Sequence, residues 1–394
     1  MFCVNCGSKI ADDAKFCTKC GAKIAGSETF IQTTQQQATQ EGKKRRFSLK
    51  KTFAILLCIV LAVAGGLHYK NKIEMEQWIE KGQKLFDQKD YTGAFDAYKK
   101  ATELSPKSEL AWEKLGNTND KLNNYKEAVE CYEKAIKINP KNAVCWNDCG
   151  LAYAKLVNYE KAIECLNKAL AIDANNAEYW DNLGVAYNNL TNYAKAIECH
   201  EKAITIDAND AIVWDNLGLA YNNSKNYAKA IECYQKSIAI NANDAIVWNN
   251  LGLAYVKTKN HEKAIECYKK AVTIDENYAT AWFNLGSDYN ELKNYAKAIE
   301  CLNKAVAINA NYASAWNNLG FSYNQIKNYT NAIECFNKAI QININNATAW
   351  YNLGYAYYCI GNLSQALHSF QKCLEFRPND KSAENWCKHI EKKL

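Results

Sequence analysis

Proline is scarce in this chain, with three residues in 394. Because proline interrupts helices and collects in loops and turns, its scarcity disfavours a loop-rich all-β fold and favours an all-α one. The sequence also has no P-loop, no G-x-S-x-G element and no H-E-x-x-H element, and its five histidines share no motif with a nucleophile. Since no catalytic residues can be named, we expect neither an enzyme nor a small-molecule substrate.

Net charge is also missing from most of the chain. The formal charge of +6 resides in residues 1–51, which hold ten Lys or Arg and four Asp or Glu, whereas residues 52–394 hold 38 of each sign. A neutral region lacks the excess of basic groups that binds a phosphate backbone. We therefore do not expect nucleic acid as a partner of this large region.

A tryptophan recurs every 34 residues without exception, at positions 78, 112, 146, 180, 214, 248, 282, 316 and 350. A glycine follows four residues after each tryptophan, and an alanine follows twelve residues after each glycine. Nine units in one register indicate a repeat architecture, in which each unit is one supersecondary element.

Each unit resolves into two predicted helices. In residues 245–278, the first half carries the spacing i, i+3, i+4, i+7 of one helix face, at Trp248, Leu251, Gly252 and Tyr255. The second half repeats that spacing around Tyr268. Glycine and alanine are small, so we expect them where the two helices press together.

Asn260 lies between the two predicted helices, at a position that is Asn or Asp in all nine units. Asn tolerates the left-handed backbone conformation in which many helices end. We therefore expect Asn260 and its equivalents to end the first helix in that conformation.

The pattern W-x2-L-G-x2-Y … A-x3-F/Y … A … P resembles the tetratricopeptide repeat, and 34 residues is the period of that family. The resemblance covers roughly residues 75–380 and implies an all-α solenoid of nine stacked hairpins, with the Trp, Tyr and Leu stripes in its core. Asn119 and Cys149 depart from the pattern, at a Tyr and a Leu position. Trp386 lies two residues out of register, so residues 381–394 are predicted as a capping helix.

Two Cys-x2-Cys pairs, each followed by a glycine, occupy residues 1–24. They comprise Cys3, Cys6, Cys17 and Cys20. Four thiolates around one tetrahedral ion form a closed structural zinc site, and so short a segment needs metal to fold. The alternative, a pair of redox motifs, lacks the βαβ pattern around it. The segment resembles the short zinc ribbons at protein N-termini, which implies zinc as the cofactor.

Residues 52–69 form an uncharged and almost wholly apolar run. A helix of this length spans roughly 27 Å, enough for a thin hydrocarbon core, so we predict a single-pass transmembrane helix in the cell membrane. A buried helix would have no domain around it. A cleaved signal peptide, suggested by the sequence Ala62-Val63-Ala64, would need an unusually long leader. Residues 25–51 are predicted to be a flexible basic linker.

Basic residues flank the apolar run unevenly. Six precede it, whereas only Lys70 and Lys72 closely follow it. The positive-inside rule places the N-terminus in the cytoplasm and the repeats outside it. The twelve cysteines of the repeats argue the other way, because exported domains avoid free thiols. We base our expectation on the charge rule.

Seven of those cysteines also follow the 34-residue period: Cys131, Cys165, Cys199, Cys233, Cys267, Cys301 and Cys335. Equivalent atoms of stacked helix pairs lie about 8–10 Å apart, and a disulfide needs Cα atoms within about 7 Å. Disulfides between neighbouring units are therefore excluded, and we predict small buried hydrophobic residues.

An asparagine lies two residues after the tryptophan in six consecutive units, at Asn182, Asn216, Asn250, Asn284, Asn318 and Asn352. Its amide offers the donor and acceptor that match a peptide backbone. The series is similar to the asparagine ladder in the repeats of O-GlcNAc transferase, which implies a peptide-binding groove lined by the first helices. The alternative is that these asparagines brace adjacent helices.

The sequence thus predicts a membrane-anchored scaffold for protein–protein interaction, whose repeats bind a polypeptide segment. One alternative is a regulatory protein whose zinc ribbon contacts nucleic acid or a cytoplasmic partner, with the repeats as sensor; Lys9, Lys15 and Phe16 permit it. Another is an enzyme subunit whose catalytic partner is a separate chain.

Overall fold

The computed structural model describes residues 1–24, 52–53, 56–58, 60–61, 66 and 69–394. They form two compact units, residues 1–107 and 108–394. The predicted linker, residues 25–51, lies outside the described residues, as do nine residues of the predicted span 52–69. Among the residues that are described, no helix is both long enough and apolar enough to cross a membrane.

The first unit contains the cysteine module of residues 1–24 and one helical hairpin. That hairpin pairs the helical residues 69–87 with α2 (Tyr91–Leu104). Gly82 faces Tyr98 across it, at the glycine position of the repeat pattern.

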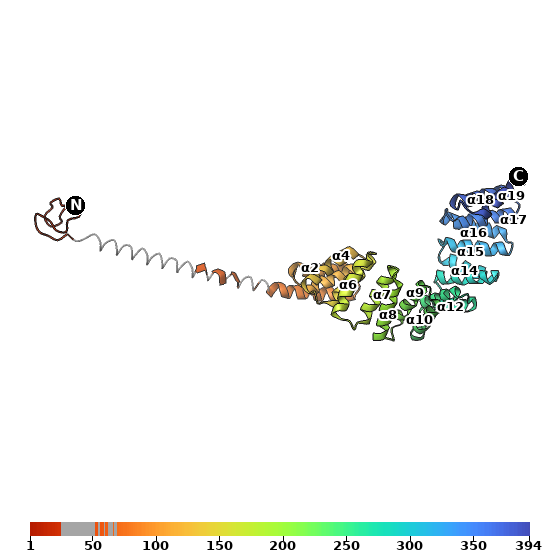
Figure 1. The fold of residues 1–394 in the computed structure, drawn as a ribbon, viewed down its shortest axis with the longest axis horizontal. Coiled ribbons are helices and arrows are strands. Elements are labelled where there is room, and N and C mark those ends of the chain that lie inside the picture. Colours follow the sequence, from red (N-terminus) through yellow and green to blue (C-terminus); the bar gives the residue numbers. More distant parts are fainter. Residues whose placement is uncertain (25–51, 54–55, 59, 62–65, 67–68) are drawn as a thin grey trace. The chain divides into compact units, whose positions relative to one another are not determined.

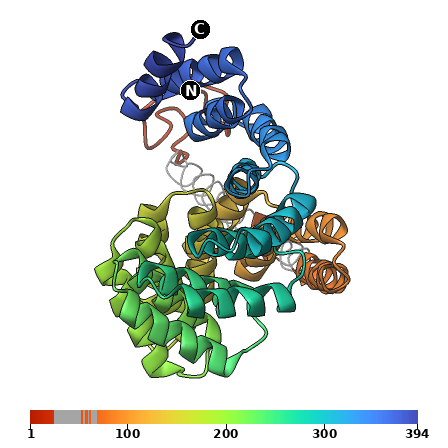
Figure 2. The ribbon, with the colours of Figure 1, turned by 90° about the vertical axis from the view of Figure 1, so that its right-hand side faces the viewer.

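The second unit is a series of helical hairpins that follow one another in chain order (Figures 1 and 2). Their first helices are α3 (Glu109–Lys121), α5 (Ala143–Lys155), α7 (Ala177–Asn189), α9 (Ala211–Asn223), α11 (Ala245–Lys257), α13 (Ala279–Glu291), α15 (Ala313–Gln325) and α17 (Ala347–Cys359). Their second helices are α4 (Tyr125–Ile138), α6 (Tyr159–Ile172), α8 (Tyr193–Ile206), α10 (Tyr227–Ile240), α12 (His261–Ile274), α14 (Tyr295–Ile308), α16 (Tyr329–Ile342) and α18 (Leu363–Phe376). The last helix, α19 (Lys381–Glu391), packs on α18.

Contacts between the helices define the solenoid. Within each hairpin the two helices pack together, and each second helix packs on the first helix of the next hairpin. First helices of neighbouring hairpins also contact each other, as α7 does α9 and α15 does α17. Because these first helices approach one another, they line the inner side of the array. We call the surface formed by α3, α5, α7, α9, α11, α13, α15 and α17 the first-helix face.

The turn inside each hairpin corrects one prediction. The left-handed residue is Lys259, with φ of 60°, and not the Asn260 that follows it. Asn260 caps α12 instead, because its Oδ1 accepts a hydrogen bond from the backbone N–H of Lys263. A side-chain acceptor here satisfies one of the free N–H groups at the start of a helix. The recurrent Asn is therefore a helix-start signal.

The small residues lie where the helices approach each other most closely, as predicted. A Cβ added to Gly252 would lie 2.5 Å from Cε1 of Tyr268 on the partner helix, closer than van der Waals contact permits. The seven periodic cysteines are confirmed as buried, with exposed fractions between 4% and 7%. Each such side chain contributes to the core as a small hydrophobe.

The tryptophans, which were predicted to lie in the core with the Tyr and Leu stripes, are less buried than expected. Trp248 packs against the core and is only partly buried. Its Nε1–H donates to the carbonyl of Ala242, in the loop before α11, at 2.9 Å. The same bond recurs from Trp282 to Glu276. The tryptophan thus fixes the loop between hairpins as well as packing, and a buried indole N–H normally finds such a partner.

Candidate metal centre and first-helix face

The N-terminal cysteine module consists of two similar loops. Each loop is closed by an antiparallel bridge, between Phe2 and Lys9 in one and Phe16 and Lys23 in the other. The glycine that follows each Cys-x2-Cys pair has a positive φ, 69° at Gly7. Such a backbone is open to glycine at little cost and allows the chain to turn around the sulfurs. Cys3, Cys17 and Ile10 form the small buried core.

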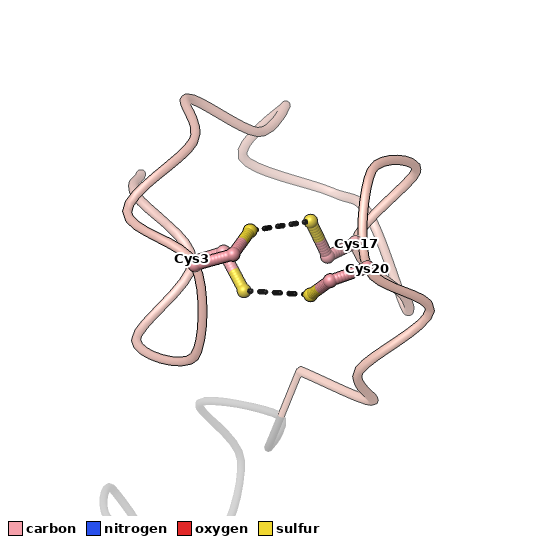
Figure 3. Close-up of side chains that lie close together, drawn as sticks. Cys3, Cys17 and Cys20 are labelled. Carbon is pink, nitrogen blue, oxygen red and sulfur yellow. Dashed lines mark hydrogen bonds between the residues drawn. The ribbon is translucent and has the colours of Figure 1, made fainter.

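The four predicted ligands converge. The Sγ atoms of Cys3, Cys6, Cys17 and Cys20 all lie within 4.8 Å of one another. The pair Cys3 and Cys20, and the pair Cys6 and Cys17, are each separated by 3.6 Å, and Figure 3 shows the two loops facing each other across them. Tetrahedral zinc with Zn–S bonds of about 2.3 Å needs sulfurs about 3.8 Å apart. The spacing therefore fits a zinc ion held by four thiolates.

At Cys6 and Cys17, hydrogen bonds favour the thiolate form that zinc binding requires, whereas the pKa of Cys20 is raised. Ser8 lies 2.7 Å from Cys6 Sγ and 3.5 Å from Cys17 Sγ. Its hydroxyl is the main cause that lowers the pKa of Cys17 to about 6, together with the backbone N–H groups of Lys19 and Cys20. Ser8 also lowers the pKa of Cys6. The sequence reasoning missed Ser8, although its place two residues after Cys6 was a usable signal.

The asparagine series forms a ladder across the first-helix face. Each amide Nδ2 donates to the hairpin before it, as Asn284 does to Asn249 Oδ1 at 2.8 Å. Equivalent bonds run from Asn182 to Asn147, from Asn216 to Asp181, from Asn250 to Asp215 and from Asn352 to Asn317. The acceptor is in each case the residue directly after a tryptophan, and the sequence reasoning did not assign it this role.

One position departs from the ladder. The residue after Trp282 is Phe283, which cannot accept a hydrogen bond, and Asn318 donates to Ser287 Oγ at 3.0 Å instead. Elsewhere the ladder branches into the core. Asp181 accepts from Asn216 through Oδ2 and lies 2.7 Å from Nδ1 of the buried His200 through Oδ1. His200 replaces the aromatic residue that normally packs on the repeat glycine.

Carboxylates on the first-helix face are partly shielded from water. Burial raises the pKa of Asp148 to about 6, and it raises the pKa of Asp215 to the same value. Desolvation disfavours the charged form of an acid, whereas a hydrogen bond from Asn250 opposes this effect at Asp215. A cationic partner on this face would favour the ionised forms.

The structure also contains one cluster of potential metal donors and one cavity that were not predicted from the sequence. Glu109, Glu113 and Cys145 bring three potential metal donors within 4.8 Å of one another. The amide of Asn142 donates to both carboxylates, so they already have hydrogen-bond donors. A cavity of about 730 Å³ is lined by α10, α11 and α12, with Trp248 and Tyr255 of α11 in its wall.

Solved structures similar to this chain include two that are described as tetratricopeptide repeat proteins. A tetratricopeptide repeat protein from Parabacteroides merdae ATCC 43184 is 20% identical, with a TM-score of 0.52, and the match covers 63% of this chain and 98% of that one. MamA is 28% identical with a TM-score of 0.39, over 42% and 97% of the two chains. YrrB, described as a TPR protein with an unusual peptide-binding site, is 23% identical with a TM-score of 0.40, over 47% and 95%. No curated protein sequence matches this chain.

Family models cover the repeats and the ribbon. Tetratricopeptide models match residues 82–123, 110–142, 131–164 and 158–190, and a zinc-ribbon model matches residues 2–24. The model described as the cilia and flagella-associated protein 70 C-terminal domain matches residues 188–387, which are 200 of the 394 residues. The chain therefore belongs to this family of tetratricopeptide repeat domains, and it carries a zinc-ribbon domain at its N-terminus.

Proposed function

We propose that this tetratricopeptide scaffold binds a basic polypeptide segment on its first-helix face. The charge distribution carries the proposal. The helices of that face (α3, α5, α7, α9, α11, α13, α15 and α17) together hold nine Asp or Glu and four Lys, a net charge of −5. The second helices (α4, α6, α8, α10, α12, α14, α16 and α18) together hold more Lys than Asp and Glu, so of the two sets of helices only the first has an excess of acidic residues. Complementary potentials steer association and suppress wrong partners.

The acidic groups gather at one end of the face. Seven of the nine lie on α3, α5, α7 and α9, including Glu113, Glu178 and Asp215. One of them, Asp120, is already paired with Lys155 at 2.7 Å. The C-terminal helices α15 and α17 carry no charged residue. We therefore assign the basic part of the ligand to the N-terminal half of the face.

The asparagine ladder supports an extended ligand. The bond from each amide to the preceding hairpin uses one N–H and leaves a second N–H for a ligand. The carbonyl oxygen is left as well, except at Asn318, where it accepts from Asn317. Asn182, Asn216, Asn250, Asn284, Asn318 and Asn352 are all partly buried, so each retains some exposure on the face. In the proposal, the ladder braces the hairpins and also presents polar groups to the ligand's main chain.

Peptide binding to the full-length chain tests the proposal. Two peptides of the same length and apolar content, one rich in Lys and one rich in Glu, are compared by fluorescence anisotropy. The basic peptide should bind more tightly, and its affinity should fall as salt is added because exposed charges are screened. The paired substitution Glu113→Gln and Glu178→Gln should weaken binding, whereas Glu198→Gln on the second helix α8 should not. Equal affinity for both peptides would refute the proposal.

The membrane anchor and the zinc ribbon complete the proposed function. Large apolar side chains in the described part of residues 52–69 are well exposed, for example Phe53 at 71% and Leu61 at 62%, and such surfaces need a covering partner. We propose a single-pass anchor with the ribbon in the cytoplasm and the repeats outside. In intact spheroplasts, added protease should then digest the chain after residue 72 and spare residues 1–24. The opposite protection pattern would show that the repeats lie in the cytoplasm and the ribbon outside. Recovery of the protein in the soluble fraction would refute the membrane anchor.

A further inference from the structure

One hairpin of the array contains a pair of facing thiols. Cys149 on α5 occupies a position that is leucine in the other hairpins of residues 108–394: Leu115, Leu183, Leu217, Leu251, Leu285, Leu319 and Leu353. Cys165 on α6 belongs to the periodic cysteine series. In the equivalent hairpin α11–α12, Leu251 and Cys267 line one cavity, as Cys149 and Cys165 do here. The exchange of a leucine for a cysteine thus places two thiols side by side.

The two side chains lie together in the core of the hairpin α5–α6. Cys149 and Cys165 belong to one buried core cluster, with exposed fractions of 1% and 7%, and an interaction between their thiols shifts the pKa of both. They line a cavity of about 320 Å³ that is open to solvent and also contains Tyr153 and Lys161. The hairpin is tight at this point, since a Cβ on the adjacent Gly150 would lie 3.2 Å from the carbonyl oxygen of Ala162. A small polar molecule can therefore reach a close thiol pair.

The interaction between the two thiols shifts their pKa values in opposite directions. The hydrogen bond from Cys149 is the main cause that lowers the pKa of Cys165, with a smaller contribution from Lys161, whereas burial and Glu133 and Glu164 oppose it. The same bond raises the pKa of Cys149. Burial raises the pKa of Cys199 to about 11 and that of Cys233 to about 12. Cys165 is accordingly the more reactive nucleophile, because thiolates and not thiols attack electrophiles.

We propose that Cys149 and Cys165 form a peroxide-reactive dithiol that is oxidised to a disulfide between α5 and α6. The Cys165 thiolate attacks one oxygen of hydrogen peroxide, so that an S–O bond forms, the O–O bond breaks and hydroxide leaves. Cys165 becomes a sulfenic acid, and the hydroxide takes up a proton to form water. The Cys149 sulfur then attacks the Cys165 sulfur, and a second water leaves as the S–S bond forms. Two thiols lose two electrons and two protons, and peroxide is reduced to two waters.

The disulfide would lock one hairpin without joining neighbouring hairpins. Both cysteines belong to α5–α6, and the cross-link closes a short loop of the chain. Reduction by a dithiol such as dithiothreitol restores the two thiols. The first-helix face beside α5 would then respond to the redox state of the surroundings.

Peptide mapping of the full-length chain tests this inference. The reduced protein is treated with hydrogen peroxide, alkylated and digested with trypsin. Cys149 falls in the peptide of residues 142–155 and Cys165 in that of residues 162–168, AIECLNK. The control thiols Cys199 and Cys233 fall in the closely similar peptides AIECHEK and AIECYQK. We expect the first two peptides to become linked, and fragmentation to place the link at Cys149 and not at Cys145.

The rates at which peroxide oxidises Cys165 and Cys199, together with the substitution Cys149→Leu, complete the test. Cys165 should react roughly tenfold faster than Cys199, since a larger thiolate fraction is partly offset by lower intrinsic nucleophilicity. Cys149→Leu restores the residue of the other hairpins, so it should fold, as circular dichroism would show. Because it removes the main group that lowers the pKa of Cys165, oxidation of Cys165 should slow to about the rate of Cys199. Oxidation of Cys165 no faster than that of Cys199 would overturn the inference. So would a link through Cys145, or the sulfinic acid forming on Cys165 in the unsubstituted chain.

Discussion

The amide Nδ2 of Asn216 lies 2.9 Å from Oδ2 of Asp181, a residue 35 positions earlier in the chain. This separation is one repeat plus one residue, so the bond joins two hairpins at the same height of their first helices. The same separation recurs from Asn284 to Asn249. Polar side chains thus connect neighbouring hairpins along the surface that we propose binds a ligand.

Loss of one ladder bond should destabilise the array. Asn284→Ala leaves Oδ1 of Asn249, whose residue is 3% exposed, without this donor. We expect the free energy of unfolding to fall by about 1 kcal/mol, measured by urea denaturation. Asn250→Ala, whose bond to Asp215 is longer at 3.4 Å, should cost less. If a variant that carries both substitutions loses stability but binds the basic peptide normally, the asparagines only brace the helices.

The partly buried Asp215 predicts a specific pH dependence of stability. Its folded pKa of about 6 exceeds its ordinary value of 3.8, so folding favours the protonated carboxyl. Its contribution is present below pH 3.8 and is lost as the pH rises through 6. Asp215→Asn introduces the residue found at the equivalent Asn249 and Asn317. The variant should be more stable at neutral pH by about 1–2 kcal/mol, and the difference should vanish near pH 3.5. A difference independent of pH would contradict the assignment.

The cysteine module should bind one zinc ion per chain. Elemental analysis of the full-length protein should find about one equivalent, and Cys6→Ser should lose it because the thiolate set is then incomplete. Cys233→Ala removes a buried thiol of the repeats and serves as the control that keeps the metal. A chelator should release the ion and disorder residues 1–24, as seen by hydrogen exchange. Retention of one equivalent in Cys6→Ser would place the metal elsewhere.

Close packing inside the hairpins predicts a graded response to one added methyl group. In Gly252→Ala the Cβ would meet Tyr268 at 2.5 Å, whereas in Gly354→Ala it would meet Phe370 at 3.1 Å. The first substitution should lower the free energy of unfolding by about 1–3 kcal/mol, and the second should have a smaller effect. Thermal denaturation of the two variants provides the measurement. Equal effects would mean that the rings move aside with equal ease.

Some local structure was predictable and some was not. The helical hairpins follow from apolar spacing, which is a property of neighbouring residues. The turn was assigned to the wrong residue because Asn is favoured both at a left-handed helix end and at a helix start. Lys259 adopts positive φ without any sequence preference for it, because the two packed helices fix the geometry of the turn between them.

The sequence by itself determined the repeat, the paired helices and the four-thiol centre, since each depends on spacings of a few residues repeated in register. The partners across hairpins were decided only by the tertiary structure. That Asn216 meets Asp181, and that Cys149 and Cys165 line one cavity, depends on how far each helix is rotated against its neighbour. A 34-residue period gives the order of the hairpins, and close packing of their side chains sets that rotation.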